Sequence, residues 1–425
     1  MCKNYWCWIK RKSCSRRSNH ERKSKLQGDL AMTPAAQVFS ASQILQEILN
    51  GKNANYLLQK WGKENRFAGS KDRRAIRDFV YDALRIKRSA LSRIKAPHSG
   101  RNWALGVLME ANEDLEQFFS DEAYGSPRLT SNEKLAIKEA TKYNKPPDVE
   151  FNLPAFLWPI WKADLGDEAV PIAKCLCKRA PAFLRVNIGR TTVEKAQQIL
   201  SEEGIHTDKH PSVITALKVI NGQNKIKSCV AYRDGLVEIQ DASSQASVTD
   251  LPVDSSLKIL DYCCGSGGKS LALHSWTTAK IFAYDAFPER TNDLRARAER
   301  AKAKILNISK PINDRFDVIF CDVPCSGSGS WRRDPDGKWK LNANSWQNLL
   351  NTQYQILNEA KELLTSDGTL VYATCSVLST ENYKQLETFC DAYPEFEIKK
   401  ARQFFPSDLG DGFFYGFLKK SKKFS

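Results

Sequence analysis

The sequence predicts a multidomain α/β protein in which a parallel, doubly wound sheet follows a small α/β module and an all-α region. A chain of 425 residues is too long for one typical hydrophobic core and is expected to hold two or three domains. Its second half repeats a buried apolar strand, a turn and a helix, which is the arrangement of a parallel sheet. Its first third instead places apolar residues at helical spacing.

Residues 1–32 form a basic segment without helical or strand periodicity. They contain nine Lys or Arg and two acidic residues, so they carry a formal charge of +7 out of +15 for the whole chain. We expect a disordered leader, or an upstream extension of the reading frame before Met32. The excess of positive charge indicates an anionic partner such as nucleic acid, because a cationic face releases phosphate counterions on binding. A solvated cationic surface without a ligand explains the remaining charge equally well.

The twelve cysteines indicate a reducing compartment, since the chain begins without the apolar core and cleavage site of a secretory signal. We therefore expect free thiols and a cytoplasmic protein. The cysteines form no C-x-x-C pair, so we predict that no metal is bound. No apolar run approaches the roughly 18 residues that span a bilayer, and we predict no membrane insertion.

Residues 33–145 are predicted to form a helical domain. Apolar residues recur at helical spacing over 44–49 and again over 76–84, where Asp72 is expected to cap the helix start. Further helices are expected at 103–119 and 132–142. The paired prolines of NKPPD, at 144–148, end this domain because proline cannot continue a helix.

Residues 146–235 are predicted to form a small α/β module, and residues 236–425 the domain with the parallel sheet. In the module we expect helices at 156–165, 168–178 and 192–203, and strands at 183–186 and 214–219. The strands of the last domain are expected in the segments LKILDY, KIFAYD, FDVIFCD and GTLVYAT. Ligands of such sheets bind at the carboxyl ends of the strands, so the residues that follow these segments are the candidates for a site.

A glycine-rich turn follows the first of these strands, in the sequence ILDYCCGSGGKS at 259–270. Gly265, Gly267 and Gly268 leave out side chains where the backbone bends tightly and can approach a ligand above a helix N-terminus. The turn does not match G-x-x-x-x-G-K-[ST], which argues against a nucleotide-hydrolysing phosphate loop. A tight strand-to-helix turn without a ligand is the alternative, and the neighbouring strand ends decide between the two.

Polar and nucleophilic side chains follow the other strands. Asp285 ends KIFAYD about twenty residues after the turn, where an acid can accept hydrogen bonds from the ribose hydroxyls of an adenosine-containing cofactor. Asp322 and Cys325 follow FDVIFC, and Cys375 follows LVYAT. Two cysteines at one sheet edge can converge on a single pocket, although a lone buried cysteine is usually a packing residue.

Two thiols beside a cofactor turn suit methyl transfer to carbon-5 of cytosine. Carbon-5 is a poor nucleophile until a thiolate adds to carbon-6, and a cysteine thiolate is strongly nucleophilic near neutral pH and can leave again. A carboxyl such as Asp322 can hydrogen-bond the polar edge of the ring. The proton on carbon-5 must then be removed, which gives a second cysteine or a bound water a role.

These motifs resemble those of the Nol/Nop/Sun family of RNA cytosine-5 methyltransferases. LDYCCGSGGKS is similar to the family's LDxCAAPGGKT, DVPCSGSGSWRRDPD to DAPCSGTGxxRRxPD, and LVYATCS with the following Glu381 and Asn382 to LVYSTCSxxxxEN. FLRVN, VEIQDASSQ and the closing DGFFYGFL also resemble family segments. From Thr33 onward the chain resembles the bacterial Sun/Fmu (RsmB) branch, whose helical N-terminal domain is NusB-like and binds RNA and which methylates small-subunit ribosomal RNA.

The resemblance implies a Rossmann-like class I methyltransferase domain, S-adenosyl-L-methionine as cofactor, and a set of site residues. It implies that Cys375 is the nucleophile and that Cys325 assists release of the methylated base. The predicted cofactor-binding residues are Cys263, Cys264, Gly265, Ser266, Gly267, Gly268, Lys269, Asp285, Arg290, Asn307 and Asp322. Ser266 and Cys264 replace the usual proline and alanine, and Asn307 lies near the position of a usual acid.

Several alternatives stay open from the sequence. DNA cytosine methyltransferases attack with the cysteine of a Pro-Cys motif, which here would make Cys325 the nucleophile. Trp331, Arg332, Arg333, Lys338 and Trp339 could hold a phosphate and stack a base, or could pack within the protein.

The substrate is likewise open. We expect RNA as the partner, small-subunit ribosomal RNA first, with the cytosine out of its stack in a loop or an unfolded segment, and a monomeric enzyme. Transfer RNA or another ribosomal site, a small-molecule methyltransferase, and a non-catalytic RNA-binding assembly factor are the rival interpretations.

Overall fold

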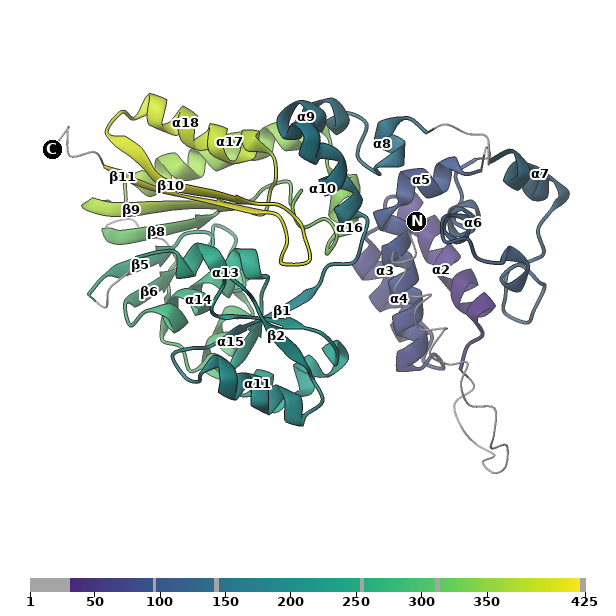
Figure 1. Ribbon diagram of the computed structural model, residues 1–425, viewed down its shortest axis with the longest axis horizontal. Helices are drawn as coiled ribbons and strands as arrows, with labels where there is room; N and C mark the ends of the chain where they lie inside the picture. Colours follow the sequence, from purple (N-terminus) through teal and green to yellow (C-terminus); the bar gives the residue numbers. More distant parts are fainter. Residues whose placement is uncertain (1–30, 95–96, 141–144, 253–255, 310–313, 421–425) are drawn as a thin grey trace. The chain divides into compact units, whose positions relative to one another are not determined.

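The computed structural model of the protein describes residues 31–94, 97–140, 145–252, 256–309 and 314–420 (Figure 1). The chain forms two compact units. Within the described residues, the helical unit comprises residues 31–179 and Trp331–Lys340, and the sheet unit comprises residues 180–330 and 341–420. The predicted leader lies outside the described residues, apart from its last two positions, and the division at 145 and 235 stays a prediction.

The helical unit is built from short helices whose apolar faces meet in one core. Its elements are α2 (Pro34–Leu49), α3 (Ala54–Glu64), α4 (Ser70–Arg85), α5 (Lys87–Ser92), α6 (Gly100–Glu110), η1 (Leu115–Gln117), α7 (Ser131–Glu139), α8 (Pro147–Glu150), α9 (Leu157–Leu165), η3 (Gly166–Glu168), α10 (Ala169–Leu176) and α16 (Pro335–Lys340). Ile44, Leu45 and Ile48 of α2 pack in this core with Ile76 and Val80 of α4, as the helical spacing predicts.

Two helix ends differ from the expectation. The helix predicted at 103–119 ends at Glu110, and Asn112 beyond it has a left-handed φ of 54°, which an α-helix does not allow. Asp72 is not the N-cap of α4 but its third residue, and its Oδ2 accepts a hydrogen bond of 3.1 Å from the backbone N–H of Gly69, which is the N-cap. Asp72 therefore caps the helix from inside its first turn.

The sheet unit begins with a small antiparallel sheet. Its strands are β1 (Ala182–Val186), β2 (Thr207–Lys209), β3 (Ala216–Val219) and β4 (Val237–Ile239), in the order β2-β3-β1-β4. Helical segments connect them: α11 (Val193–Glu202), η4 (Gln223–Ser228) and α12 (Val230–Arg233). The strand predicted at 214–219 begins at Ala216, because Ala216 N–H closes a turn on the carbonyl of Val213 and leaves Ile214 exposed.

The central sheet confirms the predicted parallel, doubly wound arrangement. Its strands are β5 (Lys258–Asp261), β6 (Lys280–Ala283), β7 (Ile305–Asn307), β8 (Phe316–Asp322), β9 (Leu364–Thr374), β10 (Phe396–Phe404) and β11 (Phe413–Lys420), in the order β10-β11-β9-β8-β5-β6-β7. The five strands from β9 to β7 pair in parallel. The chain then adds β10 and β11 as an antiparallel hairpin at the edge, with β11 against β9.

Helices cover both faces of this sheet (Figure 1). They are α13 (Ala242–Thr249), α14 (Gly268–Trp276), η5 (Pro288–Thr291), α15 (Leu294–Ala301), α17 (Ala343–Lys361), η6 (Ser379–Glu381) and α18 (Tyr383–Ala392). Val318 and Phe320 of β8 pack in the core that includes α13 and α14, while Ile319 and Cys321 pack in the core that includes α17 and α18. This alternation follows from the two-residue period of a strand, and it leaves the strand ends free for polar groups.

No helix in the described ranges is both long enough and apolar enough to cross a membrane. The cysteines in these ranges all have free thiols: Cys175, Cys177, Cys229, Cys263, Cys264, Cys321, Cys325, Cys375 and Cys390. Within the same ranges, no group of three or more His, Cys, Asp or Glu residues is placed to hold a metal ion.

We predict that Gly106→Ala destabilises the helical unit and that Gly62→Ala does not. A Cβ on Gly106 would lie 2.0 Å from the backbone oxygen of Ala90, so α5 and α6 would have to separate, at a cost of about 2 kcal/mol. Gly62 lies inside α3 with its nearest neighbour atoms 3.8 Å from such a Cβ, so alanine should raise the free energy of unfolding by about 0.5–1 kcal/mol. Urea unfolding of the full chain, followed by circular dichroism, tests both, and equal stabilities of the two variants would contradict the close packing of α5 and α6.

Candidate active site

The turn between β5 and α14 leaves open space beside its glycines. Gly265 and Gly267 have φ values of +47° and +82°, which only glycine adopts readily. A Cβ on Gly267 would lie 2.1 Å from Leu294 Cδ1, so this glycine is required for packing. Added Cβ atoms on Gly265 and Gly268 would meet nothing within 4 Å. The turn therefore presents bare backbone to an open space, as a closely bound ligand requires.

Asp285 fixes the other side of this turn. Its Oδ2 accepts a hydrogen bond of 2.9 Å from the N–H of Gly265, and its Oδ1 accepts one of 3.0 Å from the N–H of Phe287. Arg290 lies 3.7 Å from the same carboxylate. Asp285 lies two residues beyond the end of β6 and is held beside the glycine turn, where the remaining lone pairs of its carboxylate can accept from hydroxyl groups.

Lys269 positions the carboxylate of Asp322. The Lys269 side chain is buried, and its Nζ lies 3.0 Å from Asp322 Oδ2 and 2.6 Å from Ser244 Oγ. The same ammonium lies 4.6 Å from the centre of the Phe413 ring. The Asp322 side chain keeps 32% of its surface exposed, so a fixed carboxylate at the end of β8 stays accessible to a ligand.

The ends of β8 and β9 bring two thiols together. The two strands pair in parallel, with Asp322 opposite Ala373, and each continues into a loop that carries a cysteine. The Sγ atoms of Cys325 and Cys375 lie 3.4 Å apart, and the backbone N–H of Gly329 donates to the carbonyl of Cys375 at 2.9 Å. The predicted convergence of these cysteines on one sheet edge is therefore present in the fold.

The two thiols differ in acidity. The hydrogen bond between the two sulfurs, in which either thiol can be the donor, lowers the pKa of Cys375 more than any other contact does, and a hydrogen bond with Ser330 adds to this effect against the opposing effect of burial. The same hydrogen bond, together with burial and the charge of Glu381, holds the pKa of Cys325 well above its usual value. Cys375 is thus the thiol that more readily becomes the nucleophilic thiolate.

Four further residues predicted to bind the cofactor lie in surroundings that differ from one another: Ser266, Asn307, Cys264 and Cys263. Ser266 Oγ accepts from Arg297 at 2.8 Å, and Asn307 is exposed at the end of β7, two strands away from β5. Burial and the charge of Asp261 raise the pKa of Cys264 to about 12, and burial raises that of Cys263 well above its usual range. These two thiols suit a lining role and are unsuited to nucleophilic attack.

Three side chains proposed as RNA contacts are buried in the helical unit. Trp331, Arg332 and Lys338 are at most 2% exposed. The Trp331 ring stacks on Trp161 at 5.9 Å, and the Arg332 carbonyl accepts two hydrogen bonds from Arg85, at 2.8 and 3.0 Å. The packing alternative therefore holds for these three residues, because a buried side chain cannot stack on a base.

Sequence reasoning assigned no role to a polar cluster behind the cysteines. Glu381 is fully buried, and its carboxylate accepts hydrogen bonds from the Ser326 N–H at 2.8 Å and from Ser376 Oγ at 2.6 Å. Ser328 Oγ lies 2.8 Å from Ser376 Oγ. Two features of the sequence point to this cluster. A serine directly follows each cysteine, and Glu381 lies near a helix start, where a buried carboxylate needs hydrogen-bond partners.

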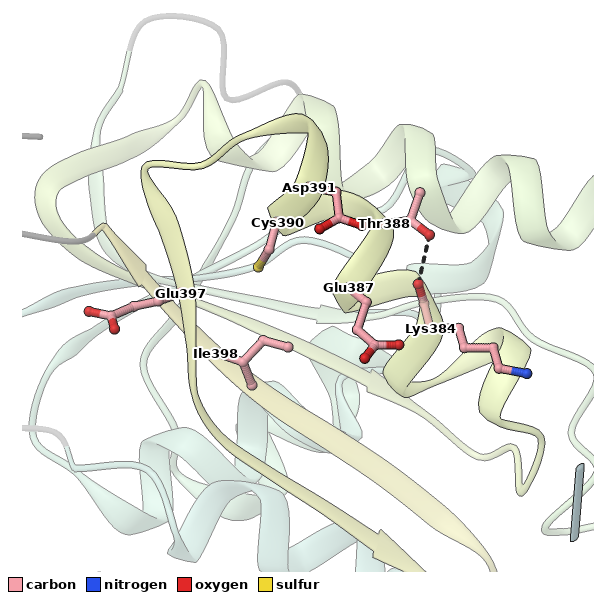
Figure 2. A pocket seen from close by; sticks show the side chains of 7 residues that line it. All are labelled: Lys384, Glu387, Thr388, Cys390, Asp391, Glu397 and Ile398. Atoms are coloured by element: carbon pink, nitrogen blue, oxygen red, sulfur yellow. Dashed lines mark hydrogen bonds between the residues drawn. The ribbon is translucent and has the colours of Figure 1, made fainter.

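A shallow hollow lies elsewhere on the sheet unit, on α18 and β10 (Figure 2). It is lined by Lys384, Glu387, Thr388, Cys390, Asp391, Glu397 and Ile398. None of the predicted cofactor-binding or catalytic residues lines it, so the candidate site stays at the ends of β5, β6, β8 and β9.

Family models and curated proteins match most of the described chain. The model for 16S rRNA methyltransferase RsmB/F matches residues 249–419, and the model for the ferredoxin-like domain of RsmF/B-like methyltransferases matches residues 153–224. Ribosomal RNA small subunit methyltransferase B from Klebsiella pneumoniae (strain 342) is 31% identical over an alignment 289 residues long that covers 63% of this chain and 67% of that protein. The protein of the same name from Vibrio cholerae is 29% identical over 63% of this chain and 65% of that protein.

Solved structures share the fold. The crystal structure of PH0851 has a TM-score of 0.72 at 20% sequence identity and covers 93% of this chain and 100% of that one. A methyltransferase homolog from Pyrococcus horikoshii has a TM-score of 0.58 at 22% identity and covers 64% of this chain and 97% of that one. At these identities the likeness concerns the fold alone.

We predict that Cys325→Ala raises the pKa of Cys375. The variant removes the hydrogen bond that most lowers this pKa, and a hydrogen bond to a charged group is among the stronger ones in a protein. The thiolate is the reactive form, so the midpoint of iodoacetamide labelling at Cys375 should move to higher pH, as measured by peptide mass spectrometry. Cys390→Ala is the matched control and should leave the midpoint in place. A lower or unchanged midpoint in Cys325→Ala would show that Cys325 does not donate to Cys375.

Proposed function

The chain belongs to the RsmB/F family of S-adenosylmethionine-dependent RNA methyltransferases, and from this membership we propose that it methylates carbon-5 of a cytosine in small-subunit ribosomal RNA. The observation that carries the proposal is the 3.4 Å separation of the Cys325 and Cys375 sulfurs beside the partly exposed carboxylate of Asp322. A nucleophilic thiol, a second thiol and an acid in one place are the groups that cytosine-5 chemistry needs.

The residues around the glycine turn fit S-adenosylmethionine. The open space at Gly265 and Gly268 admits a ligand against the backbone, and Asp285 can accept hydrogen bonds from ribose hydroxyls. We assign Arg290, Asn307, Asp322 and the turn from Cys263 to Lys269 to the same pocket. When bound, this cofactor supplies an electrophilic methyl group that carbon-5 of the ring accepts.

In this proposal Cys375 is the nucleophile. Its thiolate forms a bond to carbon-6, and the electron pair of the 5,6 double bond then becomes available at carbon-5. Asp322 hydrogen-bonds the polar edge of the ring, where charge develops during the addition. The lowered pKa of Cys375 and the raised pKa of Cys325 support this assignment over the reverse one.

Cys325 assists the release of the product. Loss of the carbon-5 proton to water returns an electron pair to the ring, restores the double bond and breaks the bond between carbon-6 and the Cys375 sulfur. The departing sulfur leaves as a thiolate, and a protonated Cys325 at 3.4 Å can stabilise it by donating a hydrogen bond. The raised pKa of Cys325 keeps that proton available near neutral pH.

The substrate assignment rests on the relatives. The curated relatives are named ribosomal RNA small subunit methyltransferase B, and we extend that substrate to this chain. We also propose a cytoplasmic location, since the nucleophile must stay a reduced thiol, and a monomeric enzyme, since one chain supplies both thiols and both acids of the site.

We predict that the purified protein transfers tritium from methyl-labelled S-adenosylmethionine to small-subunit ribosomal RNA. Separated pools of small-subunit, large-subunit and transfer RNA, each tested with and without refolding, serve as competing substrates. Bisulfite sequencing of the labelled RNA then locates the modified cytosine. Label confined to transfer RNA or to large-subunit RNA would show that this RNA, and not small-subunit ribosomal RNA, is the substrate. Absence of label in every pool would favour a non-catalytic assembly factor.

We predict opposite behaviour for the two cysteine variants. Cys375→Ala should abolish both turnover and the covalent protein–RNA adduct, because no sulfur remains to add to carbon-6. Cys325→Ala should still form the adduct and accumulate it, because the departing thiolate loses its hydrogen-bond donor. Denaturing gel electrophoresis with labelled RNA measures the adduct, and accumulation in Cys375→Ala instead would exchange the two roles.

A further inference from the structure

We propose that Glu381 is a positioning residue that ties the loops of Cys325 and Cys375 together and so sets the distance between their sulfur atoms. This inference rests on the proposed function for its consequence in catalysis, but the geometry that carries it does not depend on the RNA. Glu381 itself touches neither sulfur among the described contacts, and it acts through the residues next to each cysteine.

The first tie runs from Glu381 to the Cys325 loop. Glu381 Oε1 accepts a hydrogen bond of 2.8 Å from the backbone N–H of Ser326, the residue that follows Cys325. Glu381 Oε2 accepts a second hydrogen bond from the Ser326 hydroxyl. Two bonds from one residue to one carboxylate fix both the position and the orientation of the backbone at Cys325.

The second tie runs to the Cys375 loop. Ser376, the residue that follows Cys375, donates its hydroxyl to Glu381 Oε2 at 2.6 Å. The Ser376 oxygen also accepts from the backbone N–H of Leu378 at 3.1 Å, which holds this serine in place. One carboxylate therefore bonds the residues that follow both cysteines, although they lie on separate loops.

Gln353 of α17 completes the attachment. Its Nε2 donates to Glu381 Oε1 at 3.1 Å and to the carbonyl of Pro324 at 3.0 Å. Pro324 directly precedes Cys325, so the backbone on both sides of this cysteine is held by the same two side chains. Gln353 and Glu381 are both fully buried, where unmade hydrogen bonds would be costly.

All four groups that bond the carboxylate are neutral: two hydroxyls, a backbone amide and a side-chain amide. Burying a carboxylate without a cation among its partners costs desolvation free energy, which hydrogen bonds from neutral groups offset only in part. The use that this geometry indicates is to hold two loops at one separation, which a carboxylate can do because its two oxygens accept several bonds at once.

The proximity of the two sulfurs can be tested without RNA, by the rate at which they form a disulfide. Diamide takes up two electrons and two protons from a pair of adjacent thiols and leaves a disulfide, so the rate of the Cys325–Cys375 disulfide reports how often the sulfurs meet. Glu381→Gln keeps the size of the side chain but loses acceptor capacity for the two hydroxyls, and it should slow this disulfide about fivefold. Ser376→Ala removes one tie only and should slow it about twofold, with less risk to folding.

Glu387→Gln is the matched control, because Glu387 is an exposed residue on α18 in the hollow of Figure 2. Its disulfide rate should equal that of the wild type. The pH midpoint of Cys375 labelling gives a second reading: losing the Cys325 contact moves it upward, whereas losing only the negative charge of Glu381 moves it downward. On RNA, Glu381→Gln should lower kcat about tenfold and leave KM unchanged, as expected of misplaced reacting groups.

A wild-type disulfide rate in folded Glu381→Gln and Ser376→Ala, or a downward midpoint in Glu381→Gln, would overturn the inference. These readings separate it from the proposed function. Slower disulfide formation in the variants of a protein that methylates no RNA would support the positioning role of Glu381 and contradict the proposed function. RNA methylation together with an unchanged disulfide rate in the variants would support the proposed function and contradict the positioning role.

Discussion

The parallel pairing of β8 with β9 is the constraint on which the rest of the site depends. Each strand ends in a loop with a cysteine, and parallel neighbours deliver those loops to the same edge of the sheet, where the sulfurs lie 3.4 Å apart. An antiparallel pair would send the two loops to opposite edges. The glycine turn after β5 and the acid after β6 reach the same edge for the same reason.

Local patterns in the sequence predicted the central sheet and the strand ends that form the site. Buried strands followed by glycine or proline turns predicted the sheet and the strand ends, and the motifs around Cys325 and Cys375 predicted which strand ends matter. The prediction of helix ends was less accurate. The end of α6 depends on the left-handed conformation of Asn112, which the spacing of apolar residues does not indicate. The confirmed parts are those in which neighbouring residues carry the information.

Contacts between distant residues could not be predicted in the same way. Ser326 and Glu381 are 55 residues apart, and no periodicity relates them, so the cluster behind the cysteines emerges only from the fold. The burial of Trp331 and Lys338 has the same origin: their segment follows a site motif in sequence but packs in the helical unit. A mixture of aromatic and basic residues describes both an RNA surface and a packed segment, and only burial distinguishes them.

The two acids near the thiols have different partners. Asp322 has an ammonium partner in Lys269, whereas Glu381 is bonded by neutral donors from both cysteine loops. The charge of Glu381 raises the pKa of both cysteines, so it does not distinguish them. The hydrogen bond between the two sulfurs is the largest influence on each thiol, and it acts in opposite directions, because it lowers the pKa of Cys375 and raises that of Cys325. The asymmetry of two chemically identical side chains therefore depends on the separation of their sulfur atoms, which we propose that the bonds to Glu381 set.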